Sequence, residues 1–180
     1  MSGSGIYTGN IAVTPDKLGR FSLPALLRKE VPITNAEKAG QKQIFISQHM
    51  TWPCLLAGGS AIRGQLDALI DQFEQRCIRR SLPFNEDDVR GRLSGAGEVV
   101  PMDESGRFTM PDNLVDLGEL RGNIFYRGMI DHFEIWGTET LFAQTDPSFD
   151  VIKRQAEAAV RAMEKVAAEK AAKGSKGDRA

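Results

Sequence analysis

The sequence has few of the residues that build metal sites and disulfide frameworks. Its 180 residues include only two cysteines, Cys54 and Cys77, and two histidines, His49 and His132. Two cysteines make no disulfide framework, and both lie in apolar or helical patterns, so we expect buried thiols. Neither histidine belongs to a ligand-spaced cluster, which argues against a structural zinc. We expect no metal, no cofactor and no small-molecule substrate, with surface or interface roles for the histidines.

Long apolar runs are also missing. None approaches the roughly 18 residues of a membrane span, and the opening MSGSGIYTGNIAV lacks the basic and apolar regions of a secretory signal. With 41% hydrophobic and 26% charged residues, the composition is that of a soluble globular protein with a real core. We therefore expect a cytoplasmic protein that does not enter membranes.

The formal net charge is only −1, which excludes a non-specific polycation. The charge is unevenly distributed: residues 1–50 carry six basic against three acidic side chains, and residues 101–150 carry three against ten. Any affinity for nucleic acid must therefore come from a local patch, or from one patch multiplied by oligomerisation.

One short stretch occurs twice. DKLGRFSLPALL (residues 16–27) and DESGRFTMPDNL (residues 103–114) share Asp, Gly-Arg-Phe, Pro and Leu at identical spacing, 87 residues apart. Asp is favoured at the first position of a type I turn, and Gly can take positive φ at its end. We expect each copy to be a strand–turn–strand hairpin, followed by a short helix that begins near Pro24 or Pro111.

The later strands align as well. Ile44-Phe45 matches Ile124-Phe125, and Leu55 matches Ile135, now 80 residues apart. We infer a duplicated module of roughly 50 residues and an α+β fold of two tandem pseudo-symmetric β-rich modules, with amphipathic helices between and after them. The expected divisions are a first module, inter-module helices, a second module, and a C-terminal helix with a flexible tail, at residues 6–58, 59–95, 96–145 and 146–180.

Two helical regions are predicted outside the modules. Apolar residues recur every three or four positions from Ile62 to Cys77, with Ser60 as N-cap, and we expect this face to join the core. Asn85 should cap a second, short helix. A final helix should run from Ser148 to about Lys173, followed by the disordered tail GSKGDRA.

The repeated turns place Arg20 and Arg107 directly after a glycine, at exposed hairpin tips. Asp16 and Asp103 could either cap the turn or pair with the arginine and orient it. A solvated arginine is the ordinary explanation for one such turn, but both copies keep Asp, Gly, Arg and Pro while the residues between them vary.

These elements resemble the MraZ family of bacterial transcriptional regulators, which are built from two AbrB-like (SpoVT-AbrB) modules. The resemblance rests on DKLGRFSLP, WPCLLAG, the intervening amphipathic helix, VVPMDESGRFTMP and FEIWGTE, and covers roughly residues 6–145. It implies swapped-hairpin modules and subunits that assemble into rings. It also implies binding to short direct repeats in double-stranded promoter DNA of the division and cell-wall gene cluster, usually as a repressor located at the nucleoid.

By the same resemblance, the basic turns meet the DNA. The matching positions are Arg20, Arg107, Gly19 and Gly106. The family's usual first turn has Lys directly before the glycine, whereas this chain has Leu18 there and Lys17 one residue earlier. Lys17 can still reach a phosphate through its long stem, but a shift of one residue in a turn re-aims the side chain.

Three other functions stay open. An antitoxin-type AbrB-like regulator would usually carry one module and a partner-binding tail. A non-DNA assembly or scaffold protein would pack the turns between subunits, and the acidic segment around Arg107 favours it. An enzyme is the third, although GRLSGAGE (residues 91–98) lacks the Lys-Ser/Thr ending of a phosphate loop.

Overall fold

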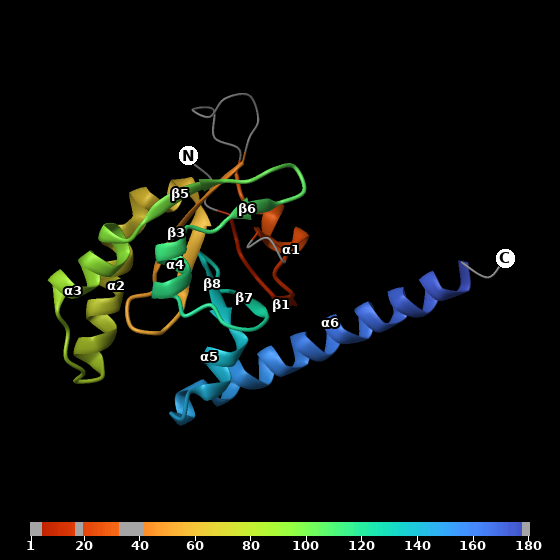
Figure 1. Cartoon of the computed structure of the whole chain (residues 1–180). Coiled ribbons are helices and arrows are strands. Elements are labelled where there is room, and N and C mark those ends of the chain that lie inside the picture. Colours follow the sequence, from red (N-terminus) through yellow and green to blue (C-terminus); the bar gives the residue numbers. More distant parts are fainter. Residues whose placement is uncertain (1–4, 17–19, 33–41, 178–180) are drawn as a thin grey trace.

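The structure, a computed structural model, describes residues 5–16, 20–32 and 42–177, with side chains as far as residue 173. Its strands form a six-stranded antiparallel sheet in the order β1-β7-β8-β4-β3-β5 and a two-stranded ribbon, β2-β6 (Figure 1). The strands are β1 (Asn10–Val13), β2 (Arg20–Ser22), β3 (Gln43–Gln48), β4 (Leu55–Gly59), β5 (Glu98–Pro101), β6 (Arg107–Thr109), β7 (Ile124–Gly128) and β8 (Phe133–Gly137). The antiparallel sheets with separate helices confirm the α+β class.

The helices lie between these strands and after them. They are α1 (Ala25–Arg28), η2 (Ser60–Gln65), α2 (Leu66–Arg79), α3 (Glu86–Arg90), η3 (Gly91–Gly95), α4 (Asp112–Leu117), α5 (Thr138–Ala143), η4 (Pro147–Phe149) and α6 (Asp150–Gly177). The order β-β-α-β-β therefore occurs twice, as the sequence repeat predicts.

The two halves of the chain exchange strands. β1 pairs with β7 of the second half, and β5 pairs with β3 of the first half. Swapping β1 with β5, β3 with β7, and β4 with β8 reverses the strand order and leaves it otherwise unchanged. The sheet therefore has an internal pseudo-twofold relation between β4 and β8. The module boundaries drawn from the sequence stay a prediction.

The strand–turn–strand hairpins expected from the sequence are wrong as strand pairs. β1 and β5 join the large sheet, whereas β2 and β6 pair with each other across the two halves. The second turn itself is closed as predicted: Asp103 N donates to Arg107 O (2.9 Å) and Gly106 N donates to Asp103 O (2.9 Å). Pairing β2 with β6 places the buried side chains of Phe21 and Phe108 side by side over the sheet. Hairpins formed within each half would not pair these two residues.

Alternating side chains place one layer on each face of the sheet. Ile44 and Ile46 of β3 face a core that also contains apolar residues of the β2-β6 ribbon, α1 and α4. Phe45, between them, points to the opposite face, where α2 and α3 cover β3 and β4. α5 and α6 cover Phe125 and Trp136 on the β7-β8 side of that same face.

The inter-module helices follow the sequence closely. Cys77 of α2 is buried together with Leu69 and Ile70, which confirms that this face belongs to the core. The helical region begins with a 3-10 turn in which Ser60 is the first residue and not the N-cap. The predicted cap at Asn85 is confirmed, since Asp88 N donates to its side chain at 3.2 Å.

The C-terminal helix α6 is longer than expected. It continues past Lys173 to Gly177, so the predicted disordered tail is wrong for residues 174–177. Its first half packs on the sheet, where Met163 Sδ accepts a 3.6 Å hydrogen bond from Thr14. Its second half extends beyond the body of the protein (Figure 1). Within the described ranges, no helix combines the length and apolar character needed to cross a bilayer.

Candidate nucleic-acid interface

The β2-β6 ribbon carries both predicted arginines. In its register Arg20 lies opposite Thr109, and Ser22 lies opposite Arg107, with Phe21 and Phe108 paired between them. Successive side chains of a strand point to opposite faces. Phe21 and Phe108 are buried against the sheet, so the two arginines, Ser22 and Thr109 share the exposed face.

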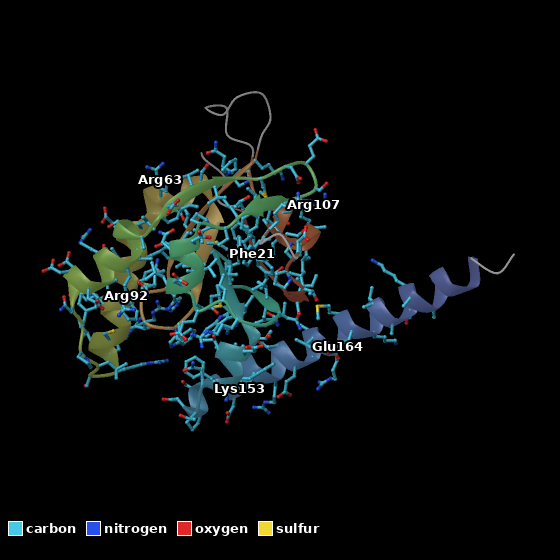
Figure 2. The ribbon with its side chains drawn as sticks, in the orientation of Figure 1. Phe21, Arg63, Arg92, Arg107, Lys153 and Glu164 are labelled. Atoms are coloured by element: carbon cyan, nitrogen blue, oxygen red, sulfur yellow. The ribbon has the colours of Figure 1, made fainter. Side chains whose placement is uncertain are left out.

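The structure therefore brings Arg20 and Arg107 to one surface. They are diagonal neighbours across the ribbon, and such neighbours lie about 7–8 Å apart. The side chain of Arg20 is 47% exposed. Figure 2 shows Arg107 at the margin of the molecule and Phe21 within its body. Neither arginine is walled in by other parts of the chain that the structure describes.

The two aspartates of the repeat play different parts. Asp16 Oδ2 accepts a hydrogen bond from Arg20 Nη2 at 3.1 Å, so it pairs with the guanidinium and orients it. Asp103 Oδ1 instead accepts from the backbone N–H of Arg107 at 2.8 Å, which caps the turn. The guanidinium of Arg107 has no acidic partner in the described part of the chain.

The other predicted site residues shape the chain around the ribbon. Gly106 has φ +83°, the left-handed conformation that the turn requires. Pro24 and Pro111 occupy the N-cap positions of α1 and α4, and their carbonyls accept the first helical hydrogen bonds. Lys17 and Gly19, like Leu18, lie outside the described residues.

Sequence reasoning missed three residues of this surface. Ser22 and Thr109 lie opposite the arginines only because strands of different halves pair. Arg28 of α1 lies against Gly106 of the other half. A difference between the copies could have pointed to Arg28: Val115 occupies the same repeat position 87 residues later.

The histidines, expected at the surface or an interface, are buried with a carboxylate. Glu134 of β8 is 1% exposed, and its Oε2 accepts from Arg127 Nη1 (3.2 Å) and Trp136 Nε1 (2.8 Å). His49 Nε2 lies 4.0 Å from the other oxygen of Glu134. His132 Nδ1 lies 2.6 Å from Asp131, and this hydrogen bond lowers the pKa of Asp131.

His49 is held neutral in this cluster. Its Nδ1 accepts hydrogen bonds from the backbone N–H groups of Thr51 and Trp52, and its ring stacks on the Trp52 indole with centroids 5.0 Å apart. Burial, followed by repulsion from nearby cations, lowers the pKa of His49 to about 3. The nearby carboxylate of Glu134 is itself paired with Arg127. The cluster is a structural network within the sheet.

Residues suited to metal binding do not converge in the described ranges, where no group of three or more His, Cys, Asp or Glu could hold an ion. Cys54 and Cys77 are buried free thiols, as predicted, and burial raises the pKa of Cys54.

Comparison with known proteins identifies the family. No family model matches the chain. The Transcriptional regulator MraZ of Caulobacter vibrioides is 30% identical over 128 residues, covering 69% of this chain and 75% of that protein. The proteins of that name from Xanthobacter autotrophicus and Rhizobium rhizogenes are each 28% identical, over 71% and 76% of this chain and 74% and 86% of their own lengths. The repeated turns, the paired halves and these relatives together show that the chain belongs to the MraZ family.

Proposed function

We propose that this protein is a sequence-specific DNA-binding transcriptional regulator that meets DNA through the β2-β6 ribbon. The observation that carries the proposal is the shared exposed face of Arg20 and Arg107, one from each half. The relatives' name supports a role in transcription. Such a regulator acts by binding and needs no catalytic group.

The ribbon suits the major groove of DNA. This groove admits a two-stranded β-ribbon, and an arginine can donate two hydrogen bonds to the O6 and N7 atoms of guanine. Each good pair of this kind contributes about 1–3 kcal/mol of discrimination. Ser22 and Thr109, on the same face, can contact bases or phosphates.

Two arginines are too few for selection within a genome. We propose that the protein forms a ring-like homo-oligomer that presents the ribbon to successive short direct repeats in its own promoter, adding these contacts through effective concentration. In line with the family resemblance, it would act at the nucleoid as a repressor of the division and cell-wall gene cluster. Repetition also explains how a chain with net charge −1 could bind DNA selectively.

We further propose that the two halves are AbrB-like modules of the swapped-hairpin type. The exchange of β1 and β5 between the halves supports this interpretation. Two modules in one chain also favour this regulator over an antitoxin-type protein with a single module. A scaffold protein remains the alternative of another class, because Asp16 already pairs with Arg20.

The test is a footprint on the protein's own upstream DNA, run with a mass measurement of the free oligomer and a salt series. We expect protected repeats and binding that weakens as salt rises. Arg20→Ala and Arg107→Ala should each abolish the specific shift of a multi-repeat probe while the oligomer persists. Specific binding unchanged in both variants would show that the ribbon is not the interface, and no shift at low salt would favour the scaffold.

A further inference from the structure

A third arginine lies beside the second turn. A Cβ atom placed on Gly106 would be 2.7 Å from Cδ of Arg28 and 2.9 Å from its Nη1. The stem and one guanidinium nitrogen of Arg28 therefore rest directly on the glycine that precedes Arg107. A residue of the first half thus extends the surface of a turn that belongs to the second half.

Backbone contacts hold α1, which carries Arg28, beside the second turn. Leu23 N donates to Gly106 O at 2.8 Å, which ties the chain just before α1 to the second turn. α1 then carries Arg28 in its last turn, and Lys42 Nζ donates to the Arg28 carbonyl at 2.8 Å. Gly106 leaves room for the arginine stem, which a side chain at that position would displace.

The charges of the two turns differ in a way that Arg28 offsets. At the same repeat position, 87 residues apart, the first turn has Lys17 and the second has Glu104. The second turn therefore carries Asp103 and Glu104 against the single cation of Arg107. Arg28 adds a second cation, and it forms no ion pair with an acidic side chain in the ranges that the structure describes.

We propose that Arg28 is a DNA phosphate contact that serves the second turn, in the role that the sequence assigns to Lys17 in the first turn. The proposal rests on the proposed function. Arg28 would anchor the backbone beside the base contacts of Arg107, because a phosphate contact positions the protein and carries no sequence information. Without it, the acidic turn would repel the phosphates that the ribbon must approach.

A phosphate contact has a measurable signature. The logarithm of the binding constant falls as log salt rises, and each neutralised phosphate makes this slope steeper by about 0.9. Losing one phosphate contact should therefore weaken binding by roughly fivefold to tenfold at 0.1 M salt. The weakening should be nearly uniform across sequences. Arg28→Gln removes the charge and keeps most of the stem that packs on Gly106. Arg28→Lys keeps the charge.

The experiment measures dissociation constants at salt concentrations from about 0.05 to 0.3 M. The two probes are the upstream DNA and a scrambled DNA of equal length. The control is Arg79→Gln, an exposed arginine in the last turn of α2. The helix α2 lies apart from β6 in Figure 1. We expect Arg28→Gln to weaken binding to both probes and to lower the slope by about 1 for each bound subunit. Arg28→Lys should keep the slope, and Arg79→Gln should match the wild type. Thermal unfolding and oligomer mass are measured for every variant.

Three results would overturn the proposal. The first is an unchanged slope and affinity for Arg28→Gln, while Arg107→Ala still loses the specific shift. The second is weaker binding only to the upstream probe, which would make Arg28 a base reader. The third is a lower melting temperature with weakened binding that Arg28→Lys fails to restore, which would make its role structural. If the wild type binds neither probe, the proposed function fails first, and the role of Arg28 fails with it.

Discussion

The rings of Phe21 and Phe108, one from each half of the chain, lie with centroids 5.9 Å apart and planes inclined by 31°. Because side chains alternate along a strand, this buried pair turns the neighbouring Arg20 and Arg107 outward. The apolar contact between the halves and the exposed basic face are therefore two sides of the same ribbon.

Truncating this pair should destabilise the fold. Phe108→Ala is expected to lower the free energy of unfolding by about 3–5 kcal/mol, because it leaves a cavity between ribbon and sheet. The matched control is Phe142→Ala on α5, whose side chain is 40% exposed and should contribute under about 1 kcal/mol. Urea unfolding measures both. Equal losses would mean that the ribbon is not packed as described.

The two aspartates of the repeat should respond differently to removal. Asp16→Ala breaks an exposed ion pair and should change the free energy of unfolding by less than about 0.5 kcal/mol. Asp103→Ala leaves the N–H of Arg107 without its cap and should lower it by about 1 kcal/mol. Chemical denaturation of the two variants decides this, and a larger loss for Asp16→Ala would contradict the assignment.

Two buried tyrosines offer another comparison. The hydroxyl of Tyr126 has no hydrogen-bond partner among the described residues, and burial raises its pKa. Tyr126→Phe should leave the free energy of unfolding unchanged or raise it by up to about 1 kcal/mol.

Tyr7 is the control for that substitution. Its Oη accepts a 2.8 Å hydrogen bond from the Gly59 N–H, which Tyr7→Phe would leave unsatisfied. A loss of about 1–3 kcal/mol is expected from Tyr7→Phe. The interpretation is contradicted if Tyr126→Phe proves the more damaging of the two.

The neutral state of His49 predicts a pH dependence. Its folded pKa of about 3 lies below the ordinary value of 6.5, so below pH 6.5 the unfolded chain binds a proton that the folded chain does not. The contribution of His49 to the stability of the fold is therefore fully present above pH 6.5 and is lost as the pH falls toward 3. Between these two pH values, the free energy of unfolding should fall by up to about 1.4 kcal/mol per pH unit.

Urea unfolding of the wild type and of His49→Gln at about pH 7, 6 and 5 tests this. Most carboxylates titrate below this range, so they contribute little to the difference. The wild type should lose stability more steeply than the variant as the pH falls. Parallel curves would assign the pH dependence to other groups.

Most elements of the fold follow from the repeat in the sequence, but strand partners do not. The apolar alternation of Ile44 and Ile46, and of their counterparts 80 residues later, predicts strands with a buried face. The same pattern would be satisfied by β1 pairing with β2 or with β7. Only the assembled sheet decides, because partner choice depends on which apolar faces meet over long distances.

In the candidate site, too, some residues can be predicted from the sequence and others only from the folded chain. Arg20 and Arg107 are recognisable because two copies keep the same turn, whereas the place of Arg28 depends on contact between halves. The histidine prediction failed for a similar reason. Nothing near His49 in sequence indicates that Glu134 would be buried beside it, held by Arg127 of the neighbouring strand.

The interchange of β1 and β5 makes this chain the single-polypeptide counterpart of an intertwined dimer. A cut in the link between α2 and α3 would leave two fragments, each with strands whose neighbours lie on the other piece. Such fragments should co-purify and melt in one transition, and neither should persist as a folded body alone. The link between α2 and α3 is therefore not needed to hold the two halves together, because the exchanged strands already do so.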